Sequence, residues 1–297
     1  MAATETRMIK TERGRFNVRL AGAETGPVIV MVHGWPESSY CWQGVAAHLP
    51  DHYRLIMPDL RGLGDSERTL DDAAYTKQAL AADMLGLLDT LGVETFNLVG
   101  HDWGGAVAQE MALAAPERVH RLVILNIHVI TNARGNAAAQ AQLRNSGGRS
   151  FWYQFFQTEP HLPEAMIPGN EEVWLGHFLK TWTREAFPAA AFEEYVRCYA
   201  IAHTPATGAA YYRCYKPDTA RWAEIAGTRF AMPGLYIYGQ HDPVIIEPFT
   251  RHLDDVFDDI RLETLDAAHF VQEERPREVA ALIAEFVGQN DHDMKGA

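Results

Sequence analysis

The stretch that decides the fold reads Gly100-His101-Asp102-Trp103-Gly104, and it separates two unlike segments. The run before it, Thr-Phe-Asn-Leu-Val over 95–99, has the composition of a buried strand. The run after it, 106–113, is typical of a helix. Glycines on both sides of the turn allow a tight change of direction, which leaves Asp102 in a strained, exposed position. We therefore expect a strand-turn-helix unit with Asp102 at its tip.

A carboxylate at such a tip favours a particular chemistry. A serine there would attack a carbonyl carbon and would need a base to remove its proton. A carboxylate is already ionised at neutral pH and suits displacement at saturated carbon, leaving an ester that water must then cleave. The aspartate therefore indicates epoxides and alkyl halides as substrates.

Cleavage of that ester needs a base and an acid that orients the base. Asp242 follows the apolar run 235–238, and His269 follows the run 260–265, so the chain order is nucleophile, acid, histidine. An alternative for Asp242 is that it only caps a helix starting near Val244. The other position used for the acid in such sites holds Asn126, which cannot be a carboxylate. We therefore predict Asp102, Asp242 and His269 as a catalytic triad.

The segment His33-Gly34-Trp35-Pro36 follows the apolar run 28–32, where an oxyanion loop belongs. We expect the backbone N–H groups of Trp35 and Trp103 to form the oxyanion hole. His33 is interpreted as a structural hydrogen-bonding residue. The stretch 58–66 lacks the lysine and helix of a phosphate loop, so we expect a buried turn with an Arg–Asp network.

Strands and helices alternate along most of the chain, which predicts an α/β fold with a mostly parallel sheet covered on both faces. Apolar runs predict six strands, at 28–32, 53–57, 96–99, 122–125, 235–238 and 260–265. The apolar spacing between 75 and 91 predicts a helix.

The alternation stops between 127 and 230, where the pattern is helical and irregular. Residues 151–222 hold 16 of the 31 Phe, Trp and Tyr residues, which fits a lid over an apolar pocket or, alternatively, the core of a helical subdomain. We expect 1–126 and 231–297 to form the core and 127–230 to form a helical lid.

Composition limits the partners. The 297 residues are 47% hydrophobic with a net charge of −13, which argues against nucleic acid and anionic membranes as partners. There is no apolar segment near the start and no run of 18 apolar residues, so we expect a cytoplasmic protein. Cys41, Cys198 and Cys214 have no metal-ligand spacing. We expect no cofactor and no metal, and the sequence leaves open whether the protein is a homodimer.

Four segments, 33–40, 58–66, 100–105 and 116–126, together resemble the soluble epoxide hydrolases of the α/β-hydrolase fold. The resemblance covers nearly the whole chain. The same branch includes haloalkane and haloacetate dehalogenases. The resemblance implies an α/β-hydrolase fold with an inserted helical lid and cofactor-free hydrolysis. One departure is Ala268, where the family commonly has glycine, so the loop that holds His269 can differ in geometry.

Other positions separate the sub-families. Haloacetate dehalogenases carry arginines one and four residues after the nucleophile, where this chain has Trp103 and Ala106. Epoxide hydrolases carry two lid tyrosines over the nucleophile. The resemblance points to Tyr153 for the first and Tyr212 for the second, with Tyr211 as the alternative. These phenols would protonate the leaving oxygen of an epoxide.

The sequence therefore predicts an epoxide hydrolase that forms a vicinal diol from a small apolar epoxide through an aspartyl ester. We expect the substrate to contact Trp35, Trp103, Trp152 and Tyr211. A haloalkane dehalogenase with the same triad is the alternative, because Trp103 and Trp152 offer indole N–H groups for a halide. A non-catalytic ligand-binding protein is disfavoured, since such a protein has no need of a complete triad.

Overall fold

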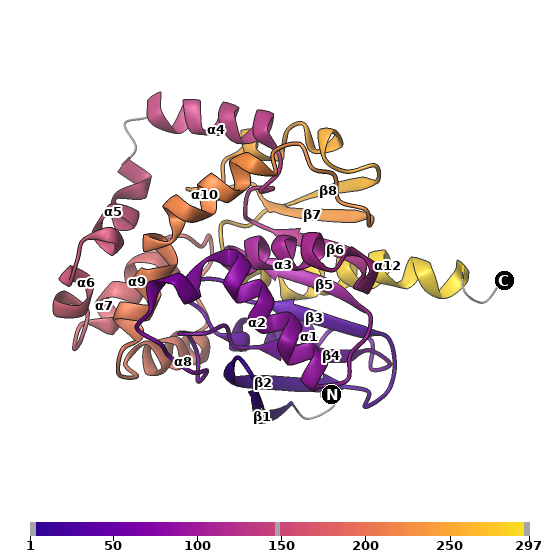
Figure 1. Ribbon diagram of the computed structural model, residues 1–297, viewed down its shortest axis with the longest axis horizontal. Helices are drawn as coiled ribbons and strands as arrows, with labels where there is room; N and C mark the ends of the chain where they lie inside the picture. Colours follow the sequence, from indigo (N-terminus) through magenta and orange to yellow (C-terminus); the bar gives the residue numbers. More distant parts are fainter. Residues whose placement is uncertain (1–3, 146–148, 294–297) are drawn as a thin grey trace.

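The computed structural model describes residues 4–145 and 149–293. Their strands form one sheet in the order β1-β2-β4-β3-β5-β6-β7-β8, in which β1 and β2 run antiparallel to their neighbours and the others are parallel (Figure 1). The strands are β1 (Glu5–Thr11), β2 (Gly14–Gly22), β3 (Val28–Val32), β4 (Arg54–Pro58), β5 (Phe96–His101), β6 (Val119–Leu125), β7 (Gly234–Gly239) and β8 (Ile260–Leu265). The predicted α/β class with a mostly parallel sheet is confirmed.

All six predicted strands are present. The apolar runs of β3 to β7 are mostly buried on both sides of the sheet, whereas β8 is an edge strand that is only partly buried. The hairpin of β1 and β2 was not predicted. Strand β1 is an edge strand whose side chains are mostly exposed, and its sequence is largely charged and polar. An edge of this kind carries no apolar run, and its charges discourage pairing with other chains.

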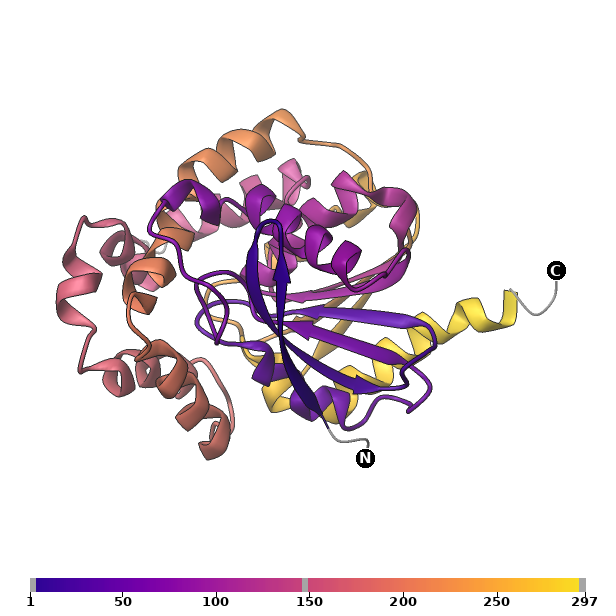
Figure 2. The ribbon, with the colours of Figure 1, turned by 60° about the horizontal axis from the view of Figure 1, so that its bottom comes forward.

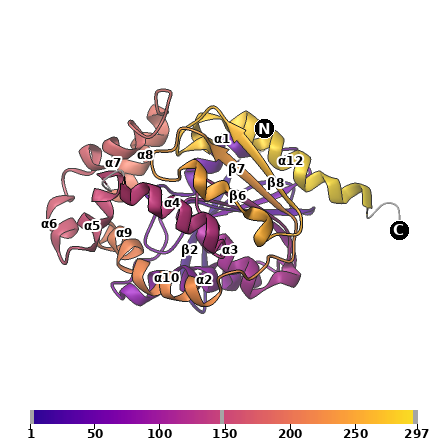
Figure 3. The ribbon, with the colours of Figure 1, turned by 90° about the horizontal axis from the view of Figure 1, so that it is seen from above.

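Helices cover both faces of the sheet (Figure 3): α2 and α3 pack together on one face, and α1 packs with α12 on the other. The helices are α1 (Gln43–Ala46), α2 (Lys77–Thr90), α3 (Trp103–Ala114), α4 (Ala133–Asn145), α5 (Trp152–Thr158), α6 (Leu162–Met166), α7 (Glu171–Leu179), α8 (Ala189–Tyr199), α9 (Thr204–Arg213), α10 (Tyr215–Glu224), α11 (Val271–Glu274) and α12 (Pro276–Asp293). The sequence pattern predicts a frayed end from residue 288, but α12 continues to Asp293; residues 294–297 lie outside the described part.

The segment between β6 and β7 carries α4 to α10. Helices α5 to α9 gather beyond one end of the sheet, on the left in Figure 1, and the same grouping is clear in Figure 2. Residues 127–230 lie within this insertion, which follows β6 at Leu125 and precedes β7 at Gly234, and we propose that they form the lid.

Two smaller expectations concern buried polar groups. Arg61 of the 58–66 turn donates to Asp83 at 2.6 Å, so the expected Arg–Asp contact is made with an aspartate of α2, outside the turn. The three cysteines are buried and unpaired. No helix among the described residues is both long and apolar enough to span a bilayer.

Candidate active site

Asp102 occupies the sharp turn between β5 and α3. Its φ of 48° and ψ of −131° lie outside the common regions for a residue with a side chain. Its backbone N–H donates to the carbonyl oxygen of Leu125 at 3.2 Å, which ties the turn to the next strand. A Cβ atom at position 104 would lie 2.2 Å from the carbonyl oxygen of His33, so glycine is required there. The predicted strand-turn-helix unit therefore depends on close packing against the loop after β3.

The three predicted triad residues meet at the carboxyl ends of β5, β7 and β8. The Nε2 atom of His269 lies 3.6 Å from Oδ2 of Asp102, and its Nδ1 lies 2.7 Å from Oδ2 of Asp242. The other oxygen of Asp242 accepts hydrogen bonds from the backbone N–H groups of Val244 and Ile245. The helix expected near Val244 is absent, since a 3-10 helix begins only at Glu247. Asp242 therefore holds the turn after β7 with one oxygen and His269 with the other.

Asn126 is a member of the site that sequence reasoning missed. Its Nδ2 donates to Oδ2 of Asp242 at 2.7 Å and to the carbonyl oxygen of Ala268 at 3.2 Å, and its Oδ1 accepts from the backbone N–H of Gly239. A polar residue at the end of β6, beside the strand that bears Asp242, was the available signal. Ala268 is accommodated in place of the usual glycine, because it is not among the described residues with positive φ.

A buried polar layer, also not predicted, lies behind the histidine. The Nε2 atom of His101 lies 2.9 Å from the backbone oxygen of His269, and its Nδ1 lies 3.0 Å from a carboxylate oxygen of Glu37. Gln272 donates to the same carboxylate. His33 accepts a backbone N–H from the 58–66 turn at 2.9 Å, which agrees with its predicted structural role. The His101 contact ties the backbone of His269 to Glu37, whereas His33 ties the loop after β3 to the 58–66 turn.

Opposing electrostatic effects act on His269. Burial disfavours its charged form, but the nearby carboxylates of Asp242 and Asp102 outweigh burial and raise the pKa of His269 to about 10. Burial alone would raise the pKa of Asp102, yet the hydrogen bond and charge of His269 bring that pKa below its usual value. In the free protein, the pair is therefore an imidazolium and a carboxylate at neutral pH.

Two backbone donors face the Asp102 carboxylate. The N–H of Trp35 donates to Oδ1 at 2.8 Å. The N–H of Trp103 is a second hydrogen-bond donor and helps to lower the pKa of Asp102. The approach is close, since a Cβ atom at position 34 would lie 2.5 Å from Oδ1. The pair has the arrangement expected of an oxyanion hole.

Two lid tyrosines contact each other close enough to the same carboxylate to be affected by its charge. The rings of Tyr153 and Tyr212 lie 5.5 Å apart and nearly perpendicular, and both pack against Trp35. Burial raises the pKa of each phenol, and the Asp102 charge adds to the effect in both. Both hydroxyl groups therefore keep their protons at neutral pH and remain able to donate them.

Tyr211, the alternative to Tyr212, points elsewhere. It is buried, its hydroxyl donates to the backbone oxygen of Arg61 at 2.8 Å, and its ring packs against Tyr75. Neighbours on a helix point in directions about 100° apart, so one of the two tyrosines must face away from Asp102. The expected contact of Tyr211 with substrate is therefore wrong for the described cavity.

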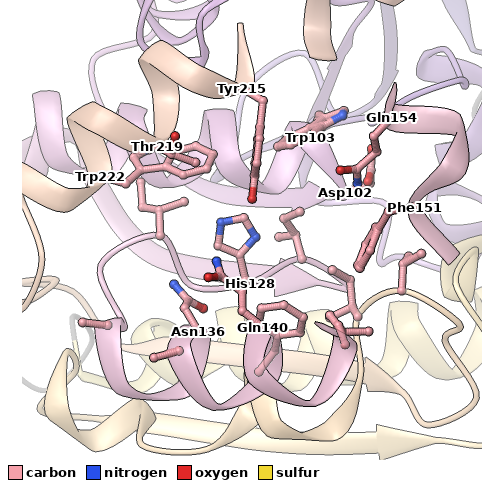
Figure 4. Close-up of a pocket in the computed structure, with 18 of the residues that line it drawn as sticks. Asp102, Trp103, His128, Asn136, Gln140, Phe151, Gln154, Tyr215, Thr219 and Trp222 are labelled. Carbon is pink, nitrogen blue, oxygen red and sulfur yellow. The ribbon is translucent and has the colours of Figure 1, made fainter. Parts of the chain in front are cut away.

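A cavity of about 710 Å³ opens beside Asp102 and Trp103 (Figure 4). Its walls come from the loop after β6, from α4, α5 and α10, and from the loop after β7. Tyr153 lines it, and Tyr212 contacts Tyr153 just outside the lining.

Of the predicted indole contacts, only Trp103 lines this cavity. Trp35 is buried beneath Tyr153, and its indole N–H donates to the hydroxyl of Tyr199 at 3.1 Å. Trp152 is 45% exposed and stacks on Phe178 at the outside of the lid. The expected substrate contacts of the Trp35 and Trp152 side chains are therefore not present in the described cavity.

Potential metal ligands cluster elsewhere. Among the described residues, Asp65, Glu194 and Cys198 bring ligand atoms within 4.8 Å of one another. Arg197 pairs with both carboxylates, at 2.8 Å in each case. The cluster is therefore explained as an ion-pair network, and its residues do not line the cavity.

Residues 27–276 match the family model described as alpha/beta hydrolase fold. The chain is 29% identical to Epoxide hydrolase A of Mycobacterium tuberculosis, over 97% of this chain and 98% of that protein. It is 31% identical to Epoxide hydrolase 1 of Siraitia grosvenorii, over 92% and 96% respectively. The crystal structure of Epoxide Hydrolase A from Mycobacterium thermoresistibile matches with a TM-score of 0.82 at 27% identity, over 96% and 98%. The chain belongs to the epoxide hydrolase family of the α/β-hydrolase fold.

Proposed function

We propose that this protein hydrolyses an epoxide to a vicinal diol through a covalent ester on Asp102. The observation that carries the proposal is the opposition of one ionised carboxylate to two proton-bearing phenols, Tyr153 and Tyr212. An epoxide needs both partners, because its ring oxygen leaves as an alkoxide that must be protonated. The full-length similarity to epoxide hydrolases supports the same assignment.

The first half-reaction follows from the two oxygens of Asp102. Oδ1 accepts from the Trp35 amide, whereas Oδ2 is the oxygen nearer His269. Oδ2 attacks a ring carbon, the carbon–oxygen bond of the ring breaks, and a tyrosine proton passes to the released oxygen. The product of this step is an ester whose carbonyl oxygen is Oδ1, already held by the backbone donors.

The second half-reaction follows from the charge that esterification removes. The Asp102 carboxylate is one of the two that raise the pKa of His269, so its loss lowers that pKa. His269 then releases its proton, which restores the tyrosine that protonated the ring oxygen. The neutral imidazole can accept a proton from water, the hydroxide attacks the ester carbonyl, and the alkoxide that leaves takes the proton of the carboxyl group so formed. Asp242 stabilises the imidazolium that forms, and the Trp35 and Trp103 amides hold the oxyanion until the diol leaves.

Single turnover in heavy-oxygen water tests the ester directly. The label should enter the Asp102 carboxylate, because water attacks the ester carbonyl and one of its oxygens stays on the protein. Peptide mass spectrometry after one turnover gives the readout. Label found in the diol alone would mean that water attacks the epoxide directly, and the covalent mechanism would be wrong.

A haloalkane dehalogenase is the second candidate. Among the described residues, the buried indole N–H of Trp103 makes no hydrogen bond of normal geometry, although it lies near enough to the Tyr212 phenol to act on the pKa of that phenol. Such a donor suits a halide. A halide site was expected to use the indole N–H groups of both Trp103 and Trp152. Trp152 is exposed, so Trp103 lacks this second donor. Bromide release from bromoalkanes faster than diol formation from every epoxide in a matched panel would favour this second function.

We propose a cytoplasmic location, which the three unpaired cysteines fit. We also propose that the reaction needs no cofactor, because each step above uses side chains and backbone groups of this chain.

A further inference from the structure

The cavity beside Asp102 is much larger than a small epoxide requires. Its volume of about 710 Å³ lies in the range of pockets that bind drug-sized ligands. In Figure 4, Asp102 and Gln154 lie on one side of the cavity, and Asn136 and Trp222 lie on the opposite side. A substrate that reacts at Asp102 can therefore extend a second group to the opposite side.

Helix α4 presents polar side chains to that side. Its cavity-lining positions 133, 136, 137, 140, 143 and 144 recur every three or four residues and form one stripe, in which Leu143 is the buried apolar member. The opposite face buries Gly135 and Ala139. The carboxamides of Asn136 and Gln140 therefore lie on the cavity side because the packing of α4 fixes which face is turned inward.

His128 is the central polar group of this region. Its ring packs against Trp222 at 5.1 Å and Phe249 at 5.9 Å, and no described residue hydrogen-bonds to its ring nitrogens. Burial lowers the pKa of His128 to about 4. The ring is therefore neutral at pH 7, with one nitrogen able to donate a hydrogen bond and the other able to accept one.

Tyr215 completes the group from the opposite wall. It lines the cavity from the start of α10, and Figure 4 shows its hydroxyl directed toward the His128 ring. Burial raises the pKa of this phenol, so it remains a donor. Within the described part of the chain, its hydroxyl has no hydrogen-bond partner. The imidazole, the phenol and the two carboxamides all line one cavity and are all neutral. Nδ2 of Asn136 donates to the backbone oxygen of Val129 at 2.9 Å, which leaves its buried Oδ1 as an acceptor, and Gln140 is exposed.

Building on the proposed function, we infer that His128, Tyr215, Asn136 and Gln140 bind a hydroxyl group of the substrate. The substrate class is then an epoxide that carries a neutral hydroxyl remote from the ring. A hydroxyl both donates and accepts, which matches side chains that offer both. A substrate that carried a carboxylate instead of the hydroxyl would pair with Arg144 rather than with these neutral side chains. Arg144 is the one cationic side chain among the described lining residues, and it is exposed.

Three epoxides of equal chain length test the inference, with a terminal methyl, hydroxyl or carboxylate group. We expect kcat/KM for the hydroxyl compound to exceed that for the methyl compound by about tenfold, as one or two net hydrogen bonds would give. A methyl compound that is used equally well would overturn the inference. So would a carboxylate compound that is preferred to the hydroxyl compound.

Variants locate the effect. His128→Leu and the nearly isosteric Tyr215→Phe should each lower the hydroxyl-to-methyl ratio about fivefold. Gln140→Leu should lower the ratio too, whereas Gln142→Leu, on the same helix but outside the lining, should not. An unchanged ratio in both His128→Leu and Tyr215→Phe would contradict the assignment.

A binding measurement separates this inference from the proposed function. Alkanols and alkanediols of equal length do not react, and Trp103 and Trp222 in the cavity wall report their binding by fluorescence. Tighter binding of the diol in the wild type than in His128→Leu would support the subsite even if no epoxide were turned over. Epoxide turnover without any such difference would leave the proposed function intact and reject the subsite.

Discussion

The two walls of the active site differ in charge. The wall formed by the sheet carries Asp102, Asp242 and His269 at three strand ends, and the lid wall facing it supplies the neutral phenols Tyr153 and Tyr212. Buried charges need several fixed hydrogen-bond partners, which backbone groups at strand ends and adjacent loops provide. The difference indicates that, at the reaction site, charge is kept at the strand ends of the sheet, and proton donors are kept on the inserted part.

One buried charge connects the two walls. Lys77, at the start of α2, is fully buried and donates to Asp218 of α10 at 2.8 Å and to the backbone oxygen of Tyr211 at 2.7 Å. Its ammonium group also lies 4.1 Å from the ring centre of Trp103. The contact couples the position of the lid to the residue that follows the nucleophile.

Removing the charge of the sheet wall should have the largest effect. Asp102→Ala removes the nucleophile and should lower kcat by about 10⁴-fold or more, measured as diol formation. It should also lower the pKa of His269 from about 10, since one of the two carboxylates that raise it is gone. Titration of the imidazole by NMR in both proteins checks the second part.

The same variant has a pH signature in stability. A histidine whose pKa is raised on folding stabilises the native state fully below about pH 6.5, and the contribution is lost as the pH rises toward 10. The wild type should therefore lose more stability than Asp102→Ala between pH 7 and 10, measured by urea unfolding. Equal losses would show that the Asp102 charge does not act on His269.

The second variant separates the two half-reactions. His269→Gln should reduce steady-state turnover by about 10³-fold, because the ester still forms but water is no longer activated. Intact-protein mass spectrometry should then show a stable gain of the substrate mass. Absence of the adduct in a folded variant, with a substrate that the wild type turns over, would contradict the role of His269 as the hydrolytic base.

The third variant breaks the connection between the walls. Lys77→Met leaves the carboxylate of Asp218 buried without its partner and should lower the free energy of unfolding by about 3–5 kcal/mol. Adding Asp218→Asn should recover much of the loss, because the amide oxygen can still accept the backbone N–H of Lys77. Lys216 is exposed and lies on α10, the helix of Asp218. Lys216→Met should therefore change the free energy of unfolding by less than about 0.5 kcal/mol. No recovery in the double variant would mean that Lys77 acts by packing alone.

The sheet wall could be predicted because its chemistry follows local patterns. Asp102, Asp242 and His269 each follow an apolar run, and parallel strands bring their ends to one edge. The sequence excludes Asn126 as the acid of the triad, because its side chain cannot be a carboxylate. Its contact with Asp242 depends on the pairing of β6 with β7, which the sequence alone does not reveal.

The lid wall could be predicted only in part. Its aromatic content indicated a cover, but Trp152 and Tyr153 are adjacent and have opposite surroundings, one exposed and the other buried against Trp35. Short helices of this kind have aromatic residues on several faces. Which face turns inward is decided by packing between helices rather than by the pattern along one of them.

The smallest expected effect distinguishes neighbours within the lid. Tyr153→Phe and Tyr212→Phe each remove one hydroxyl donor and keep the ring, so each should slow ester formation by about 10- to 1000-fold. Tyr211→Phe is the matched control, one residue away on α9. Its hydroxyl bonds to Arg61, so the variant should lose about 1 kcal/mol of stability and leave the rate of ester formation within about twofold. Rapid-quench single-turnover measurements with one epoxide compare all three. A Tyr211→Phe rate as slow as that of Tyr212→Phe would remove the distinction between the two residues, and full activity in both Tyr153→Phe and Tyr212→Phe would remove the lid from the chemistry altogether.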